Sequence, residues 1–102
     1  VARMDLDPLT LGVPRATLSD LVGGDAVANA QVVREVVAGQ PGPIRDVVVL
    51  NAAAALVAYG KPAASRLEDD FADELERARQ AIDSGAAQSK LQEWIAVTQS
   101  LR

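Results

Sequence analysis

The chain has 102 residues, a formal net charge of −4, and neither histidine nor cysteine. The absence of these two residue types excludes a disulfide framework, the usual zinc sites and imidazole-based acid–base catalysis. No run of Lys or Arg forms a basic stripe, so we predict that the chain binds no nucleic acid. This length corresponds to one domain or less, with a modest core.

The apolar residues are mostly small. Hydrophobic residues make up 49% of the chain and aromatic residues 3%, which predicts a thin core of closely packed helices. The longest apolar run, 47–59, is shorter than the roughly 20 residues that cross a membrane. We therefore expect no membrane partner. The chain begins with Val1 and no apolar leader, which predicts a fragment of a cytoplasmic protein.

The N-terminal part differs in pattern from the rest. Residues 1–18 lack a helical repeat, and their two prolines restrict the neighbouring backbone to extended conformations. We predict an extended lead-in over 1–18. The segments around the two prolines are expected to be loops, and at most one short strand is expected, at 3–6. A single helical turn is expected at 16–21, capped by Thr17 or Ser19.

The remaining residues, 19–102, predict a helical region. Apolar residues recur every three or four positions, and glycine and proline separate the periodic segments. The predicted helices span 25–38, 43–59, 66–83 and 85–101. The fold class is thus mainly α, in a single partial domain over 1–102. The second helix is apolar on every side apart from Asn51, which predicts that it is the central helix.

The predicted helix ends rest on specific residues. Asp25 can cap the first helix, and Gly39 can end it in a left-handed conformation. Pro43 suits the first turn of the second helix, and Gly60 ends that helix. Residues 65–68, Ser-Arg-Leu-Glu, match a capping box at the start of the third.

Two charged clusters are candidates for ligand binding. The sequence Gly23-Gly24-Asp25 at a helix start can attract an anion, but the Asp25 carboxylate occupies that position, which favours a simple helix cap. Asp69-Asp70 and Asp73-Glu74 share a helix face and can hold Mg²⁺. Acidic residues near a helix N-terminus are also favoured by the helix dipole alone, so we interpret them as a solvated face.

Two asparagines and one tryptophan remain. Asn29 and Asn51 lie on apolar surfaces and need hydrogen-bond partners, and we interpret them as a structural tie that fixes the register of the first two helices. A substrate contact is the alternative. Trp94 is interpreted as a core or interface anchor. We predict no catalytic, substrate-binding or metal-binding residue in this chain.

Several short blocks together resemble one enzyme family. They include an Asp-Pro to Leu-Gly lead-in, a Pro-Arg pair and a Gly-to-Pro turn, and their order covers nearly the whole chain. In order, the blocks are Asp7-Pro8 to Leu11-Gly12, Pro14-Arg15, Gly23-Gly24-Asp25-Ala26-Val27-Ala28-Asn29-Ala30, Gly39 to Pro43, Asn51-Ala52-Ala53-Ala54-Ala55-Leu56, Asp83-Ser84-Gly85-Ala86-Ala87 and Lys90-Leu91. The chain resembles the C-terminal segment of the larger domain of anthranilate phosphoribosyltransferases.

The resemblance implies a longer, dimeric, magnesium-dependent enzyme of the nucleoside phosphorylase/phosphoribosyltransferase fold type. Such an enzyme joins anthranilate to phosphoribosyl diphosphate in tryptophan biosynthesis. The family's Gly-Thr-Gly-Gly-Asp diphosphate loop and Asp-Glu metal pair fall upstream of the segment that this chain resembles. Neither role is therefore transferred to residues 23–25 or to the acidic pairs, and we expect this chain to bind no magnesium.

Two functions of different class follow as hypotheses. One is an inactive structural fragment of the phosphoribosyltransferase; the other is a free-standing helical interaction module without catalysis. Pyrimidine-nucleoside phosphorylase shares the fold, but the block over 23–30 argues against it.

Because covering elements would be missing, we also expect self-association, as a homodimer, through the apolar stripe of Leu67, Phe71 and Leu75 or that of Leu91, Trp94 and Ile95.

Overall fold

The computed structural model describes residues 5–60 and 66–101. Two short 3₁₀ helices, η1 (Pro8–Leu11) and η2 (Leu18–Leu21), precede four α-helices. The α-helices are α1 (Ala26–Val37), α2 (Pro43–Tyr59), α3 (Leu67–Asp83) and α4 (Ala86–Ser100). The described residues contain no strand, and the mainly α fold class is confirmed.

The lead-in is more ordered than the sequence predicted. A 3₁₀ helix, η1, stands where a loop was expected, because the Asp7 carboxylate accepts a hydrogen bond from the Leu9 amide at 3.0 Å. The predicted turn at 16–21 is confirmed as η2, which Thr17 caps. Of the predicted strand at 3–6, residues 3 and 4 lie outside the described residues, and residues 5 and 6 have no regular secondary structure.

The four predicted helices are confirmed with ends within one residue. Asp25 caps α1 through an oxygen that accepts from the Ala28 amide at 2.8 Å. Gly39 follows α1 with φ of +102°, a conformation that residues with a Cβ rarely adopt. Pro43 opens α2, as its missing N–H allows. The predicted capping box involves Ser65, which lies outside the described residues.

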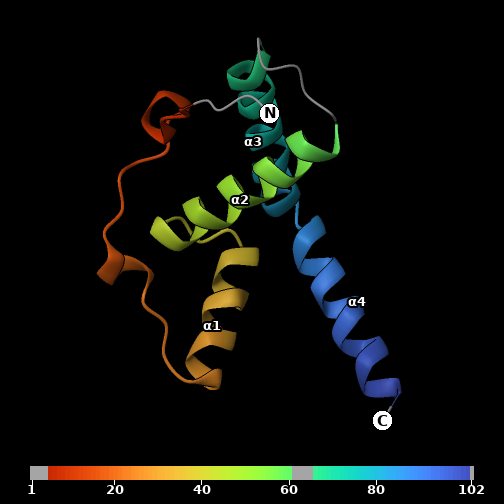
Figure 1. Ribbon diagram of the computed structural model, residues 1–102. Coiled ribbons are helices and arrows are strands. Elements are labelled where there is room, and N and C mark those ends of the chain that lie inside the picture. Colours follow the sequence, from red (N-terminus) through yellow and green to blue (C-terminus); the bar gives the residue numbers. More distant parts are fainter. Residues whose placement is uncertain (1–4, 61–65, 102) are drawn as a thin grey trace.

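The core lies between α2 and α3, which cross in Figure 1 and contact each other more extensively than any other two elements do. Four buried side chains come from α3, three from α2, and one each from α1 and the lead-in. They are Val13, Val36, Val49, Ala53, Val57, Phe71, Leu75, Ala78 and Ile82. The core contains one aromatic ring and is otherwise aliphatic. The prediction of a thin core is thus confirmed.

Among residues 5–60 and 66–101, no set of elements surrounds helix α2, and this part of the prediction is wrong. One side of α2 packs on α3, while Val48, Asn51 and Tyr59 are exposed on the remainder. The physical reason is that α1 and α4 also lie against α3, so they leave the outer side of α2 uncovered. An apolar sequence pattern therefore does not by itself place a helix at the centre of the described residues.

Helix α4 buries no residue, and in Figure 1 it extends away from α1 and α2. The Trp94 side chain is 69% exposed, so the interpretation of Trp94 as a core residue is wrong. Ile95 and Leu101 are also exposed. Of the two stripes expected to lose cover, that of α3 is buried at Phe71 and Leu75, and the stripe on α4 is the uncovered one.

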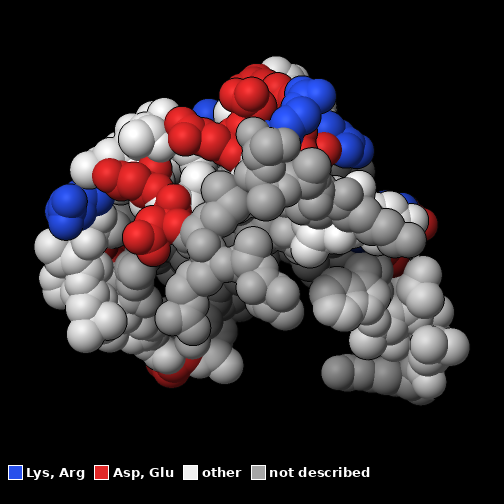
Figure 2. All heavy atoms as spheres, turned by 45° about the horizontal axis from the view of Figure 1, so that its top comes forward, with Lys and Arg blue, Asp and Glu red and all other residues white. Residues whose placement is uncertain are grey.

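The charged residues are unevenly distributed over the surface. On the face in Figure 2, acidic side chains form a band, with basic side chains at its ends. Among the described residues, no helix is long and apolar enough to cross a membrane.

Candidate functional site

The turn before α1 is held by the side chain of Asn29. Its Oδ1 accepts a hydrogen bond from the Gly24 amide at 2.9 Å, and its Nδ2 donates to the Gly24 carbonyl at 3.0 Å. Both groups of the Asn29 amide are therefore satisfied by one residue's backbone. Asn29 is a structural residue, as predicted, but it ties a loop to its own helix and not α1 to α2.

Gly23 is fixed by the same arrangement. A Cβ atom at position 23 would lie 2.7 Å from Asn29 Oδ1, closer than real Cβ contacts. The Asn29 side chain cannot retreat without losing both bonds to Gly24. The pattern Gly-Gly-Asp followed four residues later by Asn thus specifies this turn. With the Asp25 carboxylate capping α1, the turn is a helix cap and offers no phosphate cradle.

Asn51 is exposed and its Nδ2 donates to the Val47 carbonyl, one turn earlier in α2, at 2.9 Å. The interpretation of Asn51 as a tie between helices is therefore wrong. The reason is that Asn51 lies on the uncovered side of α2, where no other described element reaches it. Its apolar neighbours in the sequence suggested burial that this chain does not provide.

The acidic residues at the start of α3 do not converge on an ion. Asp70, Asp73 and Glu74 line a cavity of about 190 Å³ beside α2. Glu74 is paired with Arg77 at 2.9 Å, and Arg66 lies 4.0 Å from Asp70. Within residues 5–60 and 66–101, no three acidic groups form a set that could hold a metal ion. These residues do not fit magnesium, and no chemical step is assigned to them.

An ion pair joins the start of α2 to the end of α3. The two terminal nitrogens of Arg45 donate to the two carboxylate oxygens of Asp83 at 2.8 and 3.2 Å. Arg45 also donates to the Gly39 carbonyl at 3.3 Å. The hydrogen bond from Arg45 lowers the pKa of Asp83 and raises that of Arg45. Sequence reasoning missed this pair because 38 residues separate its members.

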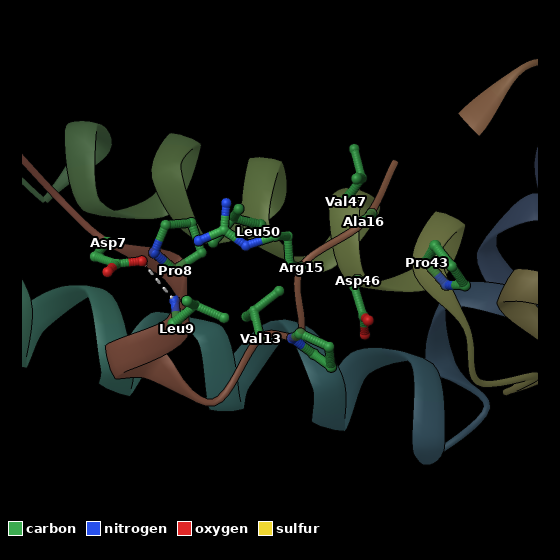
Figure 3. A pocket seen from close by; sticks show the side chains of 11 residues that line it. Asp7, Pro8, Leu9, Val13, Arg15, Ala16, Pro43, Asp46, Val47 and Leu50 are labelled. Carbon is green, nitrogen blue, oxygen red and sulfur yellow. Dashed lines mark hydrogen bonds between the residues drawn. The ribbon is translucent and has the colours of Figure 1, made fainter. Parts of the chain in front are cut away.

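A cavity of about 280 Å³ lies between the lead-in and the start of α2 (Figure 3). Its charged lining residues are Asp7, Arg15 and Asp46, and Val13 and Leu50 contribute apolar surface. In Figure 3 the Arg15 side chain extends along the cavity toward Leu50. The lining holds no hydroxyl, thiol or imidazole, so it contains no paired nucleophile and base. The cavity can hold a small apolar group but offers no catalytic constellation.

A second, larger hollow lies between the segment before α1, α1 itself and α2. This groove has a volume of about 560 Å³, and none of its lining residues is charged. Neither hollow has a direct signal in the sequence, because each depends on how distant segments pack. The described residues thus offer binding surfaces and helix caps, and the geometry assembles no catalytic site from them.

Comparison with known proteins identifies the family. The sequence model of the "Glycosyl transferase family, a/b domain" matches residues 1–88. The chain is 54% identical over 103 residues to the anthranilate phosphoribosyltransferase of Leifsonia xyli subsp. xyli, an alignment that covers 96% of this chain and 30% of the relative. For the enzyme of the same name from Arthrobacter sp. (strain FB24), the identity is 51% over 98 residues, covering 96% and 28%.

A third relative, from Thermobifida fusca, is 52% identical over 95 residues, covering 93% of this chain and 27% of that protein. The chain therefore belongs to the glycosyl transferase family with the a/b domain. Within that family, it is similar to a C-terminal segment of anthranilate phosphoribosyltransferases, which confirms the resemblance read from the sequence. The chain spans about 30% of the length of the curated relatives that it matches.

Proposed function

We propose that this chain is the C-terminal structural part of an anthranilate phosphoribosyltransferase. The whole enzyme would transfer the phosphoribosyl group of phosphoribosyl diphosphate to anthranilate, a step of tryptophan biosynthesis, with magnesium as its metal. The observation that carries the proposal is identity of 54% and 51%, along almost the whole chain, to proteins of that name. The cytoplasmic location read from the sequence stays a prediction.

The chain itself is proposed to be inactive. Departure of a diphosphate calls for metal ions and clustered donors that stabilise the developing charge. The cavity beside Arg15 has two carboxylates, Asp7 and Asp46, which repel a diphosphate. Among the described residues, the acidic groups of α3 do not converge on an ion. These observations support a structural role for the segment, with the reacting groups supplied by the rest of the enzyme.

A chimera tests this function. In it, the 102 residues replace the matching segment of the Leifsonia xyli enzyme, and phosphoribosyl transfer to anthranilate is measured. We expect turnover in the chimera and none in the isolated chain at any substrate concentration. A folded chimera without turnover would contradict the proposal for the whole enzyme. Turnover by the purified short chain would contradict the structural role.

We also propose that the isolated chain forms a homodimer through α4. The exposed side chains of Trp94, Ile95 and Leu101 form an apolar stripe along this helix and its C-terminal end, and a second copy can cover that stripe. Sedimentation velocity at tens of micromolar tests this pairing, and Trp94→Ser should shift the distribution toward monomer. A single monomeric species in the unsubstituted chain would contradict the proposal.

A further inference from the structure

The cavity between the lead-in and α2 combines an apolar lining with charged groups of both signs (Figure 3). Its volume of about 280 Å³ is near the lower end of the range of about 300–1,000 Å³ that is typical of small-molecule sites. Val13, Val47 and Leu50 provide apolar surface, and Val13 belongs to the core. Small-molecule sites are mostly apolar and carry a few polar groups that orient the ligand. The cavity therefore has the composition of a site for a small ligand.

The three charged side chains of the lining differ in how they are used. The Asp7 carboxylate caps η1, because it accepts a hydrogen bond from the Leu9 amide at 3.0 Å. Within residues 5–60 and 66–101, neither Arg15 nor Asp46 uses its side chain in a hydrogen bond or an ion pair. In Figure 3 these two side chains do not point toward each other. This part of the chain thus presents one positive and one negative group to a ligand.

The Asp46 carboxylate lies in a setting that favours a cationic partner. Asp46 is half-buried, and the adjacent Arg45 is paired with Asp83 at 2.8 Å. A half-buried carboxylate gains more from a nearby cation than an exposed one does, because water screens the interaction less. Arg15 is exposed, and its side chain extends along the cavity toward Leu50. A ligand in the cavity can therefore meet both charges and the apolar lining together.

We propose that this cavity binds a free α-amino acid with an aliphatic side chain. The ligand's carboxylate accepts hydrogen bonds from the Arg15 guanidinium, and its ammonium group donates to the Asp46 carboxylate. Its side chain packs on Val13, Val47 and Leu50. A purely cationic ligand would leave Arg15 unpaired. A purely anionic ligand would leave Asp46 unpaired, beside a second carboxylate. The site is separate from phosphoribosyl transfer, so the inference goes beyond the proposed function and does not rest on it.

An NMR titration of the 102-residue chain with L-leucine tests the proposal. Three further probes each lack one feature of L-leucine: glycine lacks the aliphatic side chain, 3-methylbutylamine the carboxylate, and 4-methylpentanoate the ammonium group. We expect L-leucine to shift the amide signals of Val47 and Leu50 in a saturable manner, with a Kd of about 1 mM. Each of the other probes should bind at least about ten-fold more weakly, because one of the three contacts is lost.

Two substitutions remove the charges while keeping the size of the side chains. Arg15→Gln and Asp46→Asn should each raise the Kd for L-leucine at least about ten-fold. The matched controls are Arg34→Gln and Asp69→Asn, because both residues are exposed and neither lines the cavity. They should change the Kd by less than about two-fold. Circular dichroism checks that each variant keeps its helices, and the exposed position of Arg15 keeps the test available if Asp46→Asn unfolds the chain.

Several results would overturn the proposal. One is the absence of saturable shifts with L-leucine in the unsubstituted chain. Another is binding of 3-methylbutylamine or 4-methylpentanoate as tight as that of L-leucine, since the cavity would then not recognise both charges. Equal effects of the cavity variants and their controls would also overturn it.

The same ligands are then compared by saturation-transfer difference NMR in the chimera with the Leifsonia xyli enzyme. We expect the same order of affinities there. A folded chimera that does not bind L-leucine would overturn the proposal, because the rest of the enzyme would then fill the cavity. Turnover of the chimera is measured separately, so failure of the proposed function and failure of this inference are distinguishable.

Discussion

Helices α3 and α4 both carry apolar stripes with helical spacing, but their environments differ. Helix α3 buries four side chains: Phe71, Leu75, Ala78 and Ile82. Helix α4 buries none, and four large apolar residues along it and at its C-terminal cap are exposed: Trp94, Ile95, Val97 and Leu101. The difference is in the partners, because α2 packs across α3 whereas α4 extends past the core (Figure 1). An apolar stripe thus identifies the helix face that is suited to burial, but it does not identify the element that buries it.

The largest test of this comparison is a pair of matched truncations. Leu75→Ala removes a side chain that is 1% exposed, and we expect a loss of about 2–5 kcal/mol in the free energy of unfolding. Leu101→Ala removes the same atoms at the end of α4, where the residue is 82% exposed, and a change within about 0.5 kcal/mol is expected. Urea unfolding followed by circular dichroism measures both. Similar losses would mean that α4 has cover of its own.

The helices were predictable because their signals are local. Caps such as Asp25, the turn at Gly39 and the proline at the start of α2 act within a few residues, so they mark helix ends directly. The 3₁₀ helix η1 was missed because a short Asp-capped turn has no periodicity to detect. Burial was predicted less well for α2 and Trp94, because it depends on how elements distant in the sequence pack, which local patterns do not specify.

The second test concerns the link between α2 and α3. Arg45→Ala removes the pair with Asp83 and the bond to the Gly39 carbonyl, so the unfolding midpoint should fall, by less than in Leu75→Ala. The Arg45 side chain is only 13% exposed, which limits screening by water. Arg77→Ala, which breaks the exposed pair with Glu74, is the control and should change little. An unchanged midpoint in Arg45→Ala would show that the pair does not hold the two helices.

The same pair predicts a pH dependence. Because Arg45 lowers the pKa of Asp83 in the folded chain, its stabilising contribution is present above the ordinary pKa of 3.8 and is lost as the pH falls through the lowered value. The difference in unfolding midpoint between the unsubstituted chain and Asp83→Asn should therefore shrink below about pH 4. Asp20, whose pKa is lowered by its bond from the Thr17 amide, also titrates in this region, but it is common to both proteins. A difference that stays constant down to about pH 2 would contradict this account.

The candidate site was predictable only where residues act on near neighbours. The interpretation of Gly23-Gly24-Asp25 as a cap was correct, because its partners lie within a few residues. The Arg45–Asp83 pair and the groove were not predicted, since both require knowledge of how α2 lies against α1 and α3. Asn29 and Asn51 looked alike in the sequence, as amides among apolar residues, and the structure separates them.

The third test compares these two asparagines. Asn29→Ala removes both bonds to Gly24 and should cost about 0.5–1.5 kcal/mol. Asn51→Ala is the matched control, because it makes the same change of helix propensity while losing only a bond to its own helix. The difference between the free energies of unfolding of these two variants gives the contribution of the turn before α1 to stability. No difference would mean that the Asn29 contacts do not stabilise the chain.

The smallest expected effect is that of Asn51→Leu on the outer side of α2. If Asn51 tied two helices together, this substitution would leave its hydrogen-bond partners unpaired and lower the free energy of unfolding by about 1–3 kcal/mol. The Asn51 amide instead bonds the Val47 carbonyl of its own helix and is exposed, so we expect a change within about 0.5 kcal/mol, aided by the better helix propensity of leucine. Urea unfolding of the isolated chain measures it. A loss above about 1 kcal/mol would show that α2 is covered on this side, and the contrast between the buried and uncovered faces of the molecule would then fail at its central helix.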